Sequence, residues 1–387
     1  MIYDNLEKKA YIKQEFPLSV SFIEGAKAEV LSKAKSSYLV KFFDNVNDNL
    51  IYETTLNPGM WAKPSPTYFI EWRVEFWLDD KLVHTRFYNC KGKRVYIHLD
   101  SKSIGDTLAW FPYIEEFRKL HECEIICSTF HNDWFKQNYP EIEFIQPGMP
   151  AHNLYASYGI GWNFWEDGKP DLSKCPSNFM ENPLQQTASD ILDIPYYEVK
   201  PKLVFKEQPN PFKIRYVVIG PHGTKHASYW NHKGGWQEIV NYLNENGYLV
   251  VMLSKEPLGN EWHDSKLGGK LHGVVDKTGD NSFEDVFNII HHADAFIGIG
   301  SGLTWVSWAL NKPTVLISGF SGYNSEMRDC IRITAKPSVC NNCFAKHKLD
   351  PGDWEWCPEY KDTHRQFECS KSITPDLVKS RIKHLLK

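Results

Sequence analysis

Several patterns that mark common classes of protein are missing from this sequence of 387 residues. No stretch approaches the roughly 20 apolar residues that a bilayer-spanning helix needs, so we expect no membrane span. The first residues carry charges with no apolar run behind them, unlike a secretory signal, and we expect a cytoplasmic protein. The formal net charge of −4 gives no basic excess for a general nucleic-acid binder, so we expect no nucleic-acid partner.

The sequence also lacks the motifs of several enzyme classes. It contains neither a G-x-S-x-G nucleophile elbow nor a Walker A loop, which weakens hydrolase and P-loop interpretations. Its 15 His residues show no H-E-x-x-H or comparable catalytic spacing. We therefore expect no catalytic metal ion.

What remains is an ordinary globular composition with many aromatic residues. Apolar residues make up 42% and charged residues 24% of the chain, as in folded domains. The chain is too long for one hydrophobic core, so we expect two to three compact domains. Burial explains most of the 14 Trp, 19 Tyr and 22 Phe, although so many Trp also suit surfaces that stack on sugars or bases.

The first 92 residues have the pattern of a β-rich domain. Residues 37–43 and 68–77 alternate or run apolar, and turn signals lie at residues 57–59 and 79–80. A small antiparallel sheet or an open barrel would bury these strands.

From Lys93 onward the pattern alternates between strand and helix, which is typical of parallel α/β sheets. A Pro-rich linker at residues 207–211 separates two such series. We expect an α/β fold with two Rossmann-like lobes. The expected strands are 94–99, 124–127, 142–145, 214–219, 248–253, 295–298 and 313–318, and the expected helices are 106–120, 235–245, 283–292 and one from Leu303. The expected domains are 1–92 (β-rich), 93–206 (first lobe), 207–335 (second lobe) and 336–387 (a four-Cys segment and a C-terminal helix).

The first candidate site follows the first strand of the first lobe. Gly105 and Asp106 stand at the carboxyl end of that strand, where open α/β sheets build their sites. In the simpler interpretation Gly105 permits the turn and Asp106 caps a helix. In the functional interpretation Asp106 is a general base that takes a proton from an attacking hydroxyl group.

The second candidate is a glycine-rich turn between a strand and a helix. Gly300, Ser301 and Gly302 allow backbone N–H groups to approach a ligand closely, and the helix start adds a positive dipole that suits a diphosphate. Ser301 and Thr304 carry hydroxyl groups that would add donors. The alternative is that the small residues serve close packing of helix on sheet.

Two lysines follow another strand of the second lobe. Lys225 and Lys233 would neutralise charge on a departing nucleoside diphosphate. The alternative is that each is an ordinary solvated surface lysine.

The most specific spacing is that of four cysteines near the end of the chain. Cys340 and Cys343 form a C-x₂-C pair, and Cys357 and Cys369 follow. Four thiolates make a closed tetrahedral site for structural zinc or a single iron, and the spacing does not separate these metals. The alternative is a set of unrelated buried thiols. A redox role is a further option, but this C-x₂-C pair does not start a βαβ unit.

These motifs together resemble the bacterial autotransporter heptosyltransferases, which are related to glycosyltransferase family nine. Gly105-Asp106-Thr107-Leu108, followed by Pro112, resembles that family's catalytic-base motif. Ser301-Gly302-Leu303-Thr304-Trp305 resembles its donor-diphosphate motif, and Lys233-Gly234-Gly235-Trp236 resembles its Lys-x-x-Trp segment. The four cysteines resemble the knuckle of the autotransporter branch, where the ion is iron.

The resemblance implies a GT-B fold that transfers heptose from ADP-heptose to serine side chains of autotransporter adhesins. It implies inversion with Asp106 as the base, one structural iron per chain with zinc as the alternative, and a large homo-oligomer such as a dodecamer. It assigns donor binding to Thr107, Leu108, Lys233, Gly300, Ser301, Gly302, Leu303, Thr304 and Trp305, with Lys225 competing with Lys233 for the diphosphate contact.

Two other functions are open at this point. One is a nucleotide-sugar transferase that acts on a glycan or lipopolysaccharide acceptor. The other is a binding module in which the four-Cys segment contacts nucleic acid. Residues 346–365 mix basic and acidic side chains, which does not favour the second alternative.

Overall fold

The computed structural model describes residues 8–10, 17–350 and 352–386, and these form two compact units. The first unit comprises the described residues up to Lys102, Trp110–Phe179 and Gln185–Val199. The second comprises Ser103–Ala109, Met180–Leu184 and the described residues from Lys200 onward. The bounds of the four domains expected from the sequence stay a prediction.

The second unit is built on a six-stranded sheet in which every strand pair is parallel. The strands are buried because helices cover both faces, which explains their nearly continuous apolar sequences. In order across the sheet they are β16 (Val275–Thr278), β15 (Leu249–Ser254), β14 (Tyr216–Gly220), β17 (Ala295–Ile299), β18 (Thr314–Ser318) and β19 (Ile331–Thr334).

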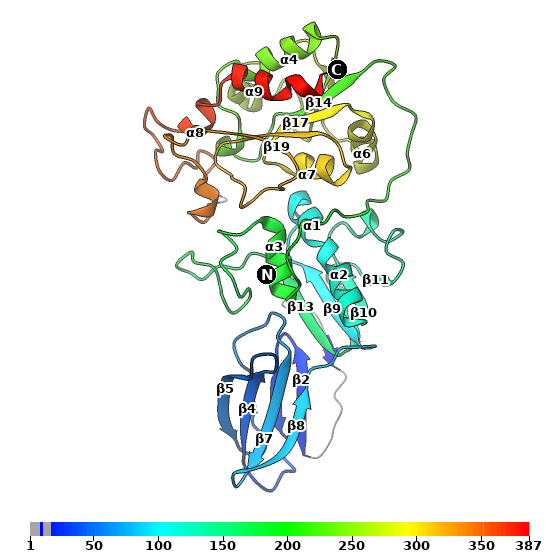
Figure 1. The fold of residues 1–387 in the computed structure, drawn as a ribbon, viewed down its shortest axis with the longest axis vertical. Helices are drawn as coiled ribbons and strands as arrows, with labels where there is room; N and C mark the ends of the chain where they lie inside the picture. Colours follow the sequence, from blue (N-terminus) through cyan, green and yellow to red (C-terminus); the bar gives the residue numbers. More distant parts are fainter. Residues whose placement is uncertain (1–7, 11–16, 351, 387) are drawn as a thin grey trace. The chain divides into compact units, whose positions relative to one another are not determined.

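Two helix pairs flank this sheet. Figure 1 shows α4 (Gly235–Glu245) and α9 (Pro375–Ile382) on one face, and α6 (Phe283–His292) and α7 (Gly302–Ala309) on the other. The expected bounds of α4 and α6 are confirmed. For α6 the N-cap is Ser282, whose side chain accepts the N–H of Asp285.

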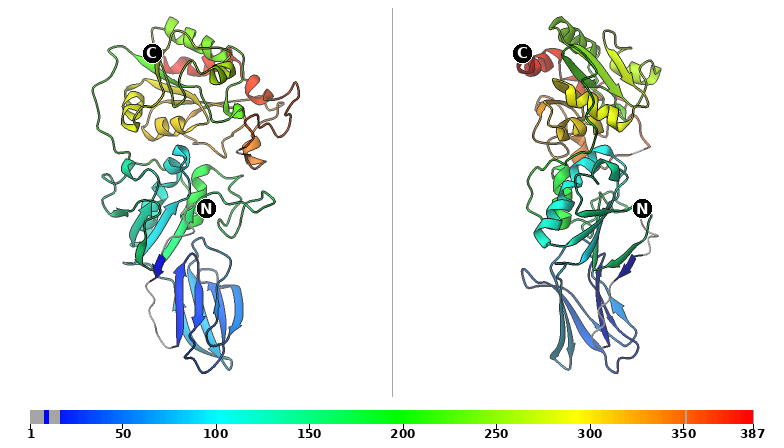
Figure 2. Two further views of the ribbon diagram at one scale, coloured as in Figure 1. Left: turned by 180° about the vertical axis from the view of Figure 1, so that it is seen from behind. Right: turned by 90° about the vertical axis from the view of Figure 1, so that its right-hand side faces the viewer.

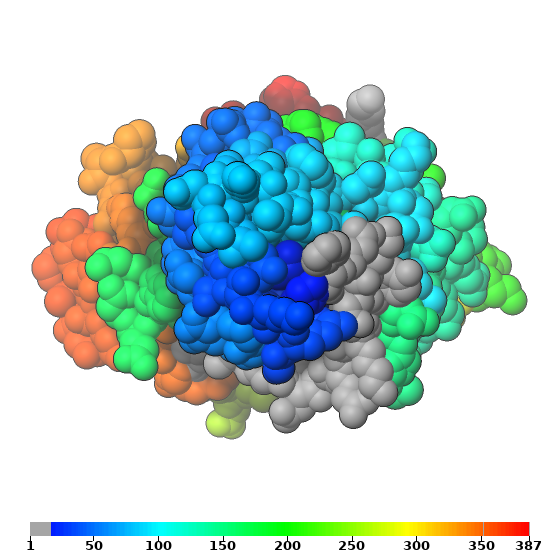
Figure 3. Space-filling view, turned by 90° about the horizontal axis from the view of Figure 1, so that it is seen from below, coloured from blue at the N-terminus to red at the C-terminus, as the bar shows by residue number. Residues whose placement is uncertain are grey.

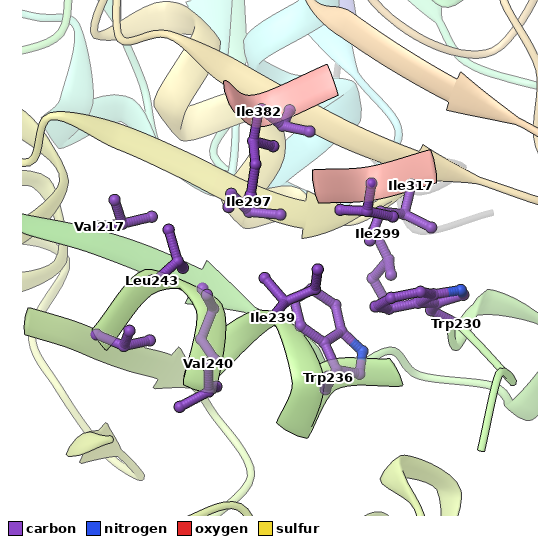
Figure 4. Packing of buried hydrophobic residues seen from close by; sticks show 14 of the residues in the cluster. Val217, Trp230, Trp236, Ile239, Val240, Leu243, Ile297, Ile299, Ile317 and Ile382 are labelled. Carbon is purple, nitrogen blue, oxygen red and sulfur yellow. The ribbon is translucent and has the colours of Figure 1, made fainter. Parts of the chain in front are cut away.

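The core of the second unit lies between the sheet and the α4–α9 face. In Figure 4, Val217, Ile297 and Ile317 of the strands face Leu243 of α4 and Ile382 of α9. All five are at most 3% exposed, so the C-terminal helix is an integral part of this core.

The first unit contains a seven-stranded mixed sheet. Its strand order reverses between β9 and β13, and the pairs from β11 to β2 are parallel. In order the strands are β11 (Ile142–Phe144), β10 (Glu124–Ser128), β9 (Arg94–Leu99), β13 (Ala156–Ile160), β2 (Leu18–Ile23), β3 (Lys27–Val30) and β6 (Trp61–Ala62).

The β-rich start of the chain is divided differently from our expectation of one small sheet or barrel. Strands β2, β3 and β6 extend the sheet that contains β9, and four others form an antiparallel sheet, seen in Figure 2. Sequence patterns reveal apolar alternation but not the partner of each strand. The antiparallel sheet has the order β5 (Asn49–Leu56), β4 (Tyr38–Asp44), β7 (Trp72–Leu78) and β8 (Lys81–Phe87).

The single helix expected over residues 106–120 is two helices, α1 (Ile104–Trp110) and α2 (Pro112–His121). Pro112 has no backbone N–H, so it cannot continue a helix but fits the first position of a new one. None of the helices in the described part of the chain has the length and apolar character to cross a membrane.

The remaining elements are short. They are β1 (Lys8–Ala10), which pairs with β12 (Ala151–Leu154), the helices α3 (Leu184–Leu192), α5 (Glu261–Leu267) and α8 (Glu368–Lys371), and the 3-10 turns η1 (Asn132–Trp134), η2 (His226–Ser228), η3 (Cys343–Ala345) and η4 (Lys383–Leu385).

The core assignment predicts a contrast between two isoleucines. Ile297 is 1% exposed in β17, so Ile297→Ala should lower the free energy of unfolding by about 2–5 kcal/mol. Ile214 is 58% exposed, so Ile214→Ala should change it by about 0.5 kcal/mol or less. Urea unfolding followed by Trp fluorescence measures both values, and equal losses would contradict the assignment.

Candidate functional site

The carboxyl ends of β14 and β17 meet where the strand order of the second unit reverses. From β14 the chain continues to β15 and β16 on one side, and from β17 to β18 and β19 on the other. Ligands of open α/β sheets bind in the crevice outside such a reversal. The structure places two of the sequence motifs there, residues 221–225 after β14 and residues 300–302 after β17.

The glycine-rich turn leads directly into α7. Ser301 is the N-cap residue with extended backbone, but its side chain does not cap the helix. The Oγ atom of Ser301 is buried without a hydrogen-bond partner in the described part of the chain. Backbone N–H groups in the first turn of a helix have no partners within the helix, and they attract anions. This turn therefore has the properties of a phosphate site.

Thr304 has a different role from the side-chain donor expected from the sequence. Its hydroxyl group donates to the carbonyl oxygen of Ile299 at 2.5 Å, and the residue is 1% exposed. This bond ties the first turn of α7 to the end of β17. A contact from Thr304 to a ligand would have to come from its backbone.

The turn that carries Asp106 belongs to the second unit and packs against the start of α7. A Cβ atom added to Gly302 would lie 2.7 Å from Cβ of Ile104, and one added to Gly105 would lie 2.8 Å from Cδ1 of Trp305. Both approaches need glycine. They bring half-buried Asp106 next to the glycine-rich turn.

The simpler interpretation of Asp106 as a helix cap does not fit this geometry. Asp106 lies inside the first turn of α1, and its own N–H points to Oγ of Ser103 at 3.4 Å. Ser103 therefore occupies the capping position. Thr107 and Leu108 are fully buried, and the hydroxyl group of Thr107 donates to the Ser103 carbonyl oxygen at 2.9 Å.

The two candidate lysines differ sharply. Lys225 is 7% exposed, and its Nζ donates to the carbonyl oxygens of Asp350 and, at 3.2 Å, Asp353. Its charge therefore ties the loop after β14 to the four-Cys segment. Lys233 is exposed beside the start of α4, so it is the better placed of the two for a soluble anion.

The segment after Lys233 mainly supports packing. Gly234 has a φ of +72°, and a Cβ on Gly235 would lie 2.8 Å from the ring of Trp230. Trp236 is completely buried in the core. Gly234 is therefore favoured by its backbone conformation, and Gly235 lets α4 start close to Trp230.

Sequence analysis did not single out His222, which lies in the loop after β14. Its Nδ1 lies 2.9 Å from Oγ of Ser254, the last residue of β15, and its Nε2 is buried without a partner in the described part of the chain. Burial, and next the nearby His263, lower the pKa of His222 to about 4. The only signal available beforehand was its position after a strand.

A buried carboxylate supports the glycine-rich turn from behind. Glu326 accepts hydrogen bonds from Ser321 and Ser318 and pairs with Arg332, whose Nε lies 2.8 Å from Oε2. A Cβ on Gly300 would lie 3.0 Å from Oγ of Ser321. Burial raises the pKa of Glu326, and the Arg332 partner opposes this shift.

The four cysteines of residues 340–369, here called the Cys segment, face one another. Each thiol lies within electrostatic range of the other three. Burial, followed by neighbouring negative groups, raises the pKa of Cys340 and Cys369 to about 12 and that of Cys343 to about 11. Thiolates here need a cation, so the donor set fits a thiolate-binding metal.

The described residues nevertheless show no three of these sulfur atoms within 4.8 Å of one another. A closed tetrahedral site would require them to move inward. The described groups that meet this distance are Glu207, His291 and His292, at the end of α6. Nε2 of His292 lies 2.7 Å from the carbonyl oxygen of Gln208. This contact attaches the end of α6 to the linker, and it explains why the three side chains lie close together.

Comparison with known proteins gives consistent matches. Residues 184–323 match glycosyltransferase family 9 (heptosyltransferase). The autotransporter heptosyltransferase BAHTCr of Citrobacter rodentium is 32% identical over 356 residues, which cover 89% of this chain and 84% of that protein. TibC, the autotransporter heptosyltransferase of enterotoxigenic Escherichia coli, is 32% identical over 362 residues, covering 89% and 85%.

A solved structure extends the likeness to the fold. TibC, described as a dodecameric iron-containing heptosyltransferase in complex with ADP-D-beta-D-heptose, matches with a TM-score of 0.88 and 29% identity. The match covers 98% of each chain. The likeness of fold therefore extends over nearly the whole chain.

The contacts of the two lysines predict different effects on stability. Lys225→Met should lower the free energy of unfolding by about 1–3 kcal/mol, because the buried Lys225 donates hydrogen bonds to two carbonyl oxygens that would lose their donor. Lys233→Met, on the surface, should change it by about 0.5 kcal/mol or less. Urea unfolding of both variants tests this, and a stable Lys225→Met protein would refute the structural role.

Proposed function

The chain belongs to the autotransporter heptosyltransferases of glycosyltransferase family 9, and from this premise we propose that it transfers heptose from ADP-heptose to serine side chains of an autotransporter passenger protein. It is thus a heptosyltransferase, and its structural neighbours are GT-B-like α/β enzymes, as the sequence led us to expect. The identity of the sugar donor, the serine acceptor and the inversion at the anomeric carbon are proposals.

The observation that carries the mechanism is the packing of the Asp106 turn on the start of α7. A carboxylate lies beside a turn suited to a diphosphate, and the two are held together by the glycine contacts of Gly105 and Gly302. In the proposed step Asp106 accepts the proton of the attacking serine hydroxyl. The serine oxygen bonds to the anomeric carbon as the bond to ADP breaks on the opposite face, which inverts that carbon.

The departing ADP carries the negative charge of the step. N–H groups at the start of α7 and the Ser301 hydroxyl are proposed to bind the diphosphate, and the helix dipole stabilises the same charge. Lys233 would add a positive charge from the surface. Leu303, Trp305, Thr107 and Leu108 would form the apolar wall that holds this turn in shape.

The Cys segment is proposed to hold one structural metal ion through Cys340, Cys343, Cys357 and Cys369. Iron is favoured because the similar TibC is described as iron-containing, and zinc is the alternative. The ion would cross-link the segment that Lys225 ties to the loop after β14. No catalytic metal is proposed.

The proposal extends to assembly and location. TibC is described as dodecameric, and we expect a large cytoplasmic homo-oligomer here as well. The antiparallel sheet of β4, β5, β7 and β8, whose atoms lie toward the viewer in blue in Figure 3, is proposed to help hold the protein acceptor. Its edge strand β8 exposes Leu82, Val83 and Phe87.

If Asp106 is the base, replacing its carboxylate by an amide should lower the transfer rate. Asp106→Asn should lower the transfer rate by about 10²–10⁴-fold while ADP binding and the thermal midpoint stay near their original values. The measurement is the intact mass of a purified passenger protein after incubation with enzyme and ADP-heptose. Glu245→Gln, on the surface at the end of α4, is the control.

The same assay distinguishes the acceptors. Added heptose on serine-containing peptides of the passenger would support the proposal. Transfer only to a glycan or lipopolysaccharide acceptor would keep the enzyme class and overturn the acceptor. Full activity of Asp106→Asn would eliminate this residue as the base.

The metal proposal predicts a contrast between two cysteines. Cys340→Ser should lower the metal content from about one ion per chain toward zero and lower the thermal midpoint, because metal binding is coupled to folding. Cys330→Ser should leave both unchanged, since Cys330 lies outside the set and its thiol donates to the Met327 carbonyl oxygen. Emission spectroscopy of the purified proteins gives the metal and its amount. Equal content in both variants would contradict the ligand assignment.

A further inference from the structure

His222 is a buried polar side chain whose hydrogen bonding is incomplete. The residue is 9% exposed, and the hydrogen bond of Nδ1 to Ser254 accounts for one ring nitrogen. Nε2 has no partner in the described part of the chain. Buried polar atoms are nearly always paired, because leaving one unpaired destabilises the fold. His222 follows β14 at the carboxyl edge of the sheet, where open α/β sheets bind ligands, so an unpaired atom here points to a ligand.

The neighbours of His222 determine which ring nitrogen carries the hydrogen. Oγ of Ser254 accepts the N–H of Glu256 at 3.1 Å, so the hydroxyl hydrogen is left for a second partner. Nδ1 of His222, at 2.9 Å, is the acceptor in reach. In the arrangement where the Ser254 hydroxyl group donates to Nδ1, the hydrogen of the neutral ring resides on Nε2, which is then a hydrogen-bond donor.

The surroundings keep this ring neutral. The ring of His263 lies 5.0 Å from that of His222, and burial lowers the pKa of His222 to about 4. The Nε2–H group is therefore an uncharged donor at physiological pH.

The loop that carries His222 lies against the proposed diphosphate turn. A Cβ added to Gly223 would lie 3.2 Å from Cδ1 of Ile299, and one added to Gly220 would lie 3.7 Å from Cδ1 of Leu303. The loop thus approaches the end of β17, and Gly220, the last residue of β14, lies beside the first turn of α7. Ser301 Oγ, the other unpaired polar atom of this region, follows β17 directly.

We infer that His222 is a donor-binding residue whose Nε2–H donates a hydrogen bond to an oxygen atom of the nucleoside diphosphate. Ser254 is the positioning residue that fixes the tautomer. The inference rests on the proposed function, because it takes a nucleoside diphosphate as the ligand. Phosphate and ribose oxygens offer the same acceptor chemistry, and the experiment separates them.

Two substitutions of His222 separate binding from packing. Gln carries an amide N–H₂ near the position of Nε2, whereas Asn carries it near the position of Nδ1. His222→Asn should therefore weaken ADP binding by about tenfold or more, and His222→Gln by about threefold or less. Ser254→Ala should weaken binding because both tautomers become populated. His272→Asn, on an exposed residue after α5, is the matched control.

Calorimetric titration of each purified full-length protein with ADP and with adenosine measures these affinities, and thermal midpoints report folding. A loss confined to ADP assigns the contact to phosphate, and an equal loss for adenosine assigns it to ribose. Unchanged affinity of His222→Asn overturns the inference, as does an equal loss in the Asn and Gln variants. If the unsubstituted protein binds no ADP and transfers no heptose, it is the proposed function that fails.

Discussion

The parallel pairing of β14 with β17 is the interaction on which the arrangement of the site depends. Because the chain leaves these neighbours in opposite directions across the sheet, their loops diverge at the edge where open α/β sheets bind ligands. Backbone pairing alone therefore decides where the glycine-rich turn, the His222 loop and the start of α7 can lie. The side chains then determine what this location binds.

Close approach is the second constraint, and it links packing to chemistry. The contacts of Gly302 with Ile104 and of Gly105 with Trp305 leave no room for a Cβ atom. Two residues without side chains thus fix the position of Asp106, the proposed base. Lys225 shows the reverse: a charged side chain stabilises the fold, because its Nζ donates hydrogen bonds to carbonyl oxygens of the Cys segment.

Local sequence patterns were sufficient where local forces dominate. The alternation of strand and helix patterns predicted the observed bounds of α4 and α6, and the strand-turn-helix order located residues 300–305. Patterns failed where the partner is distant in sequence. Pro112 alone indicates the break between α1 and α2. The contact of Lys225 with the Cys segment and the unpaired Nε2 of His222, in contrast, depend on tertiary contacts that no spacing encodes.

Strand β2 has a consequence for the order in which the chain folds during synthesis. It pairs with β13, and the N–H of Glu24 donates to Oγ of Ser157, a residue 133 positions further along. The neighbouring antiparallel sheet, in contrast, is complete once β8 has been made. On the ribosome this sheet can form early, while β2 must wait with an unpaired edge until β13 emerges. Chaperones that shield strand edges would therefore act on this segment of the nascent chain.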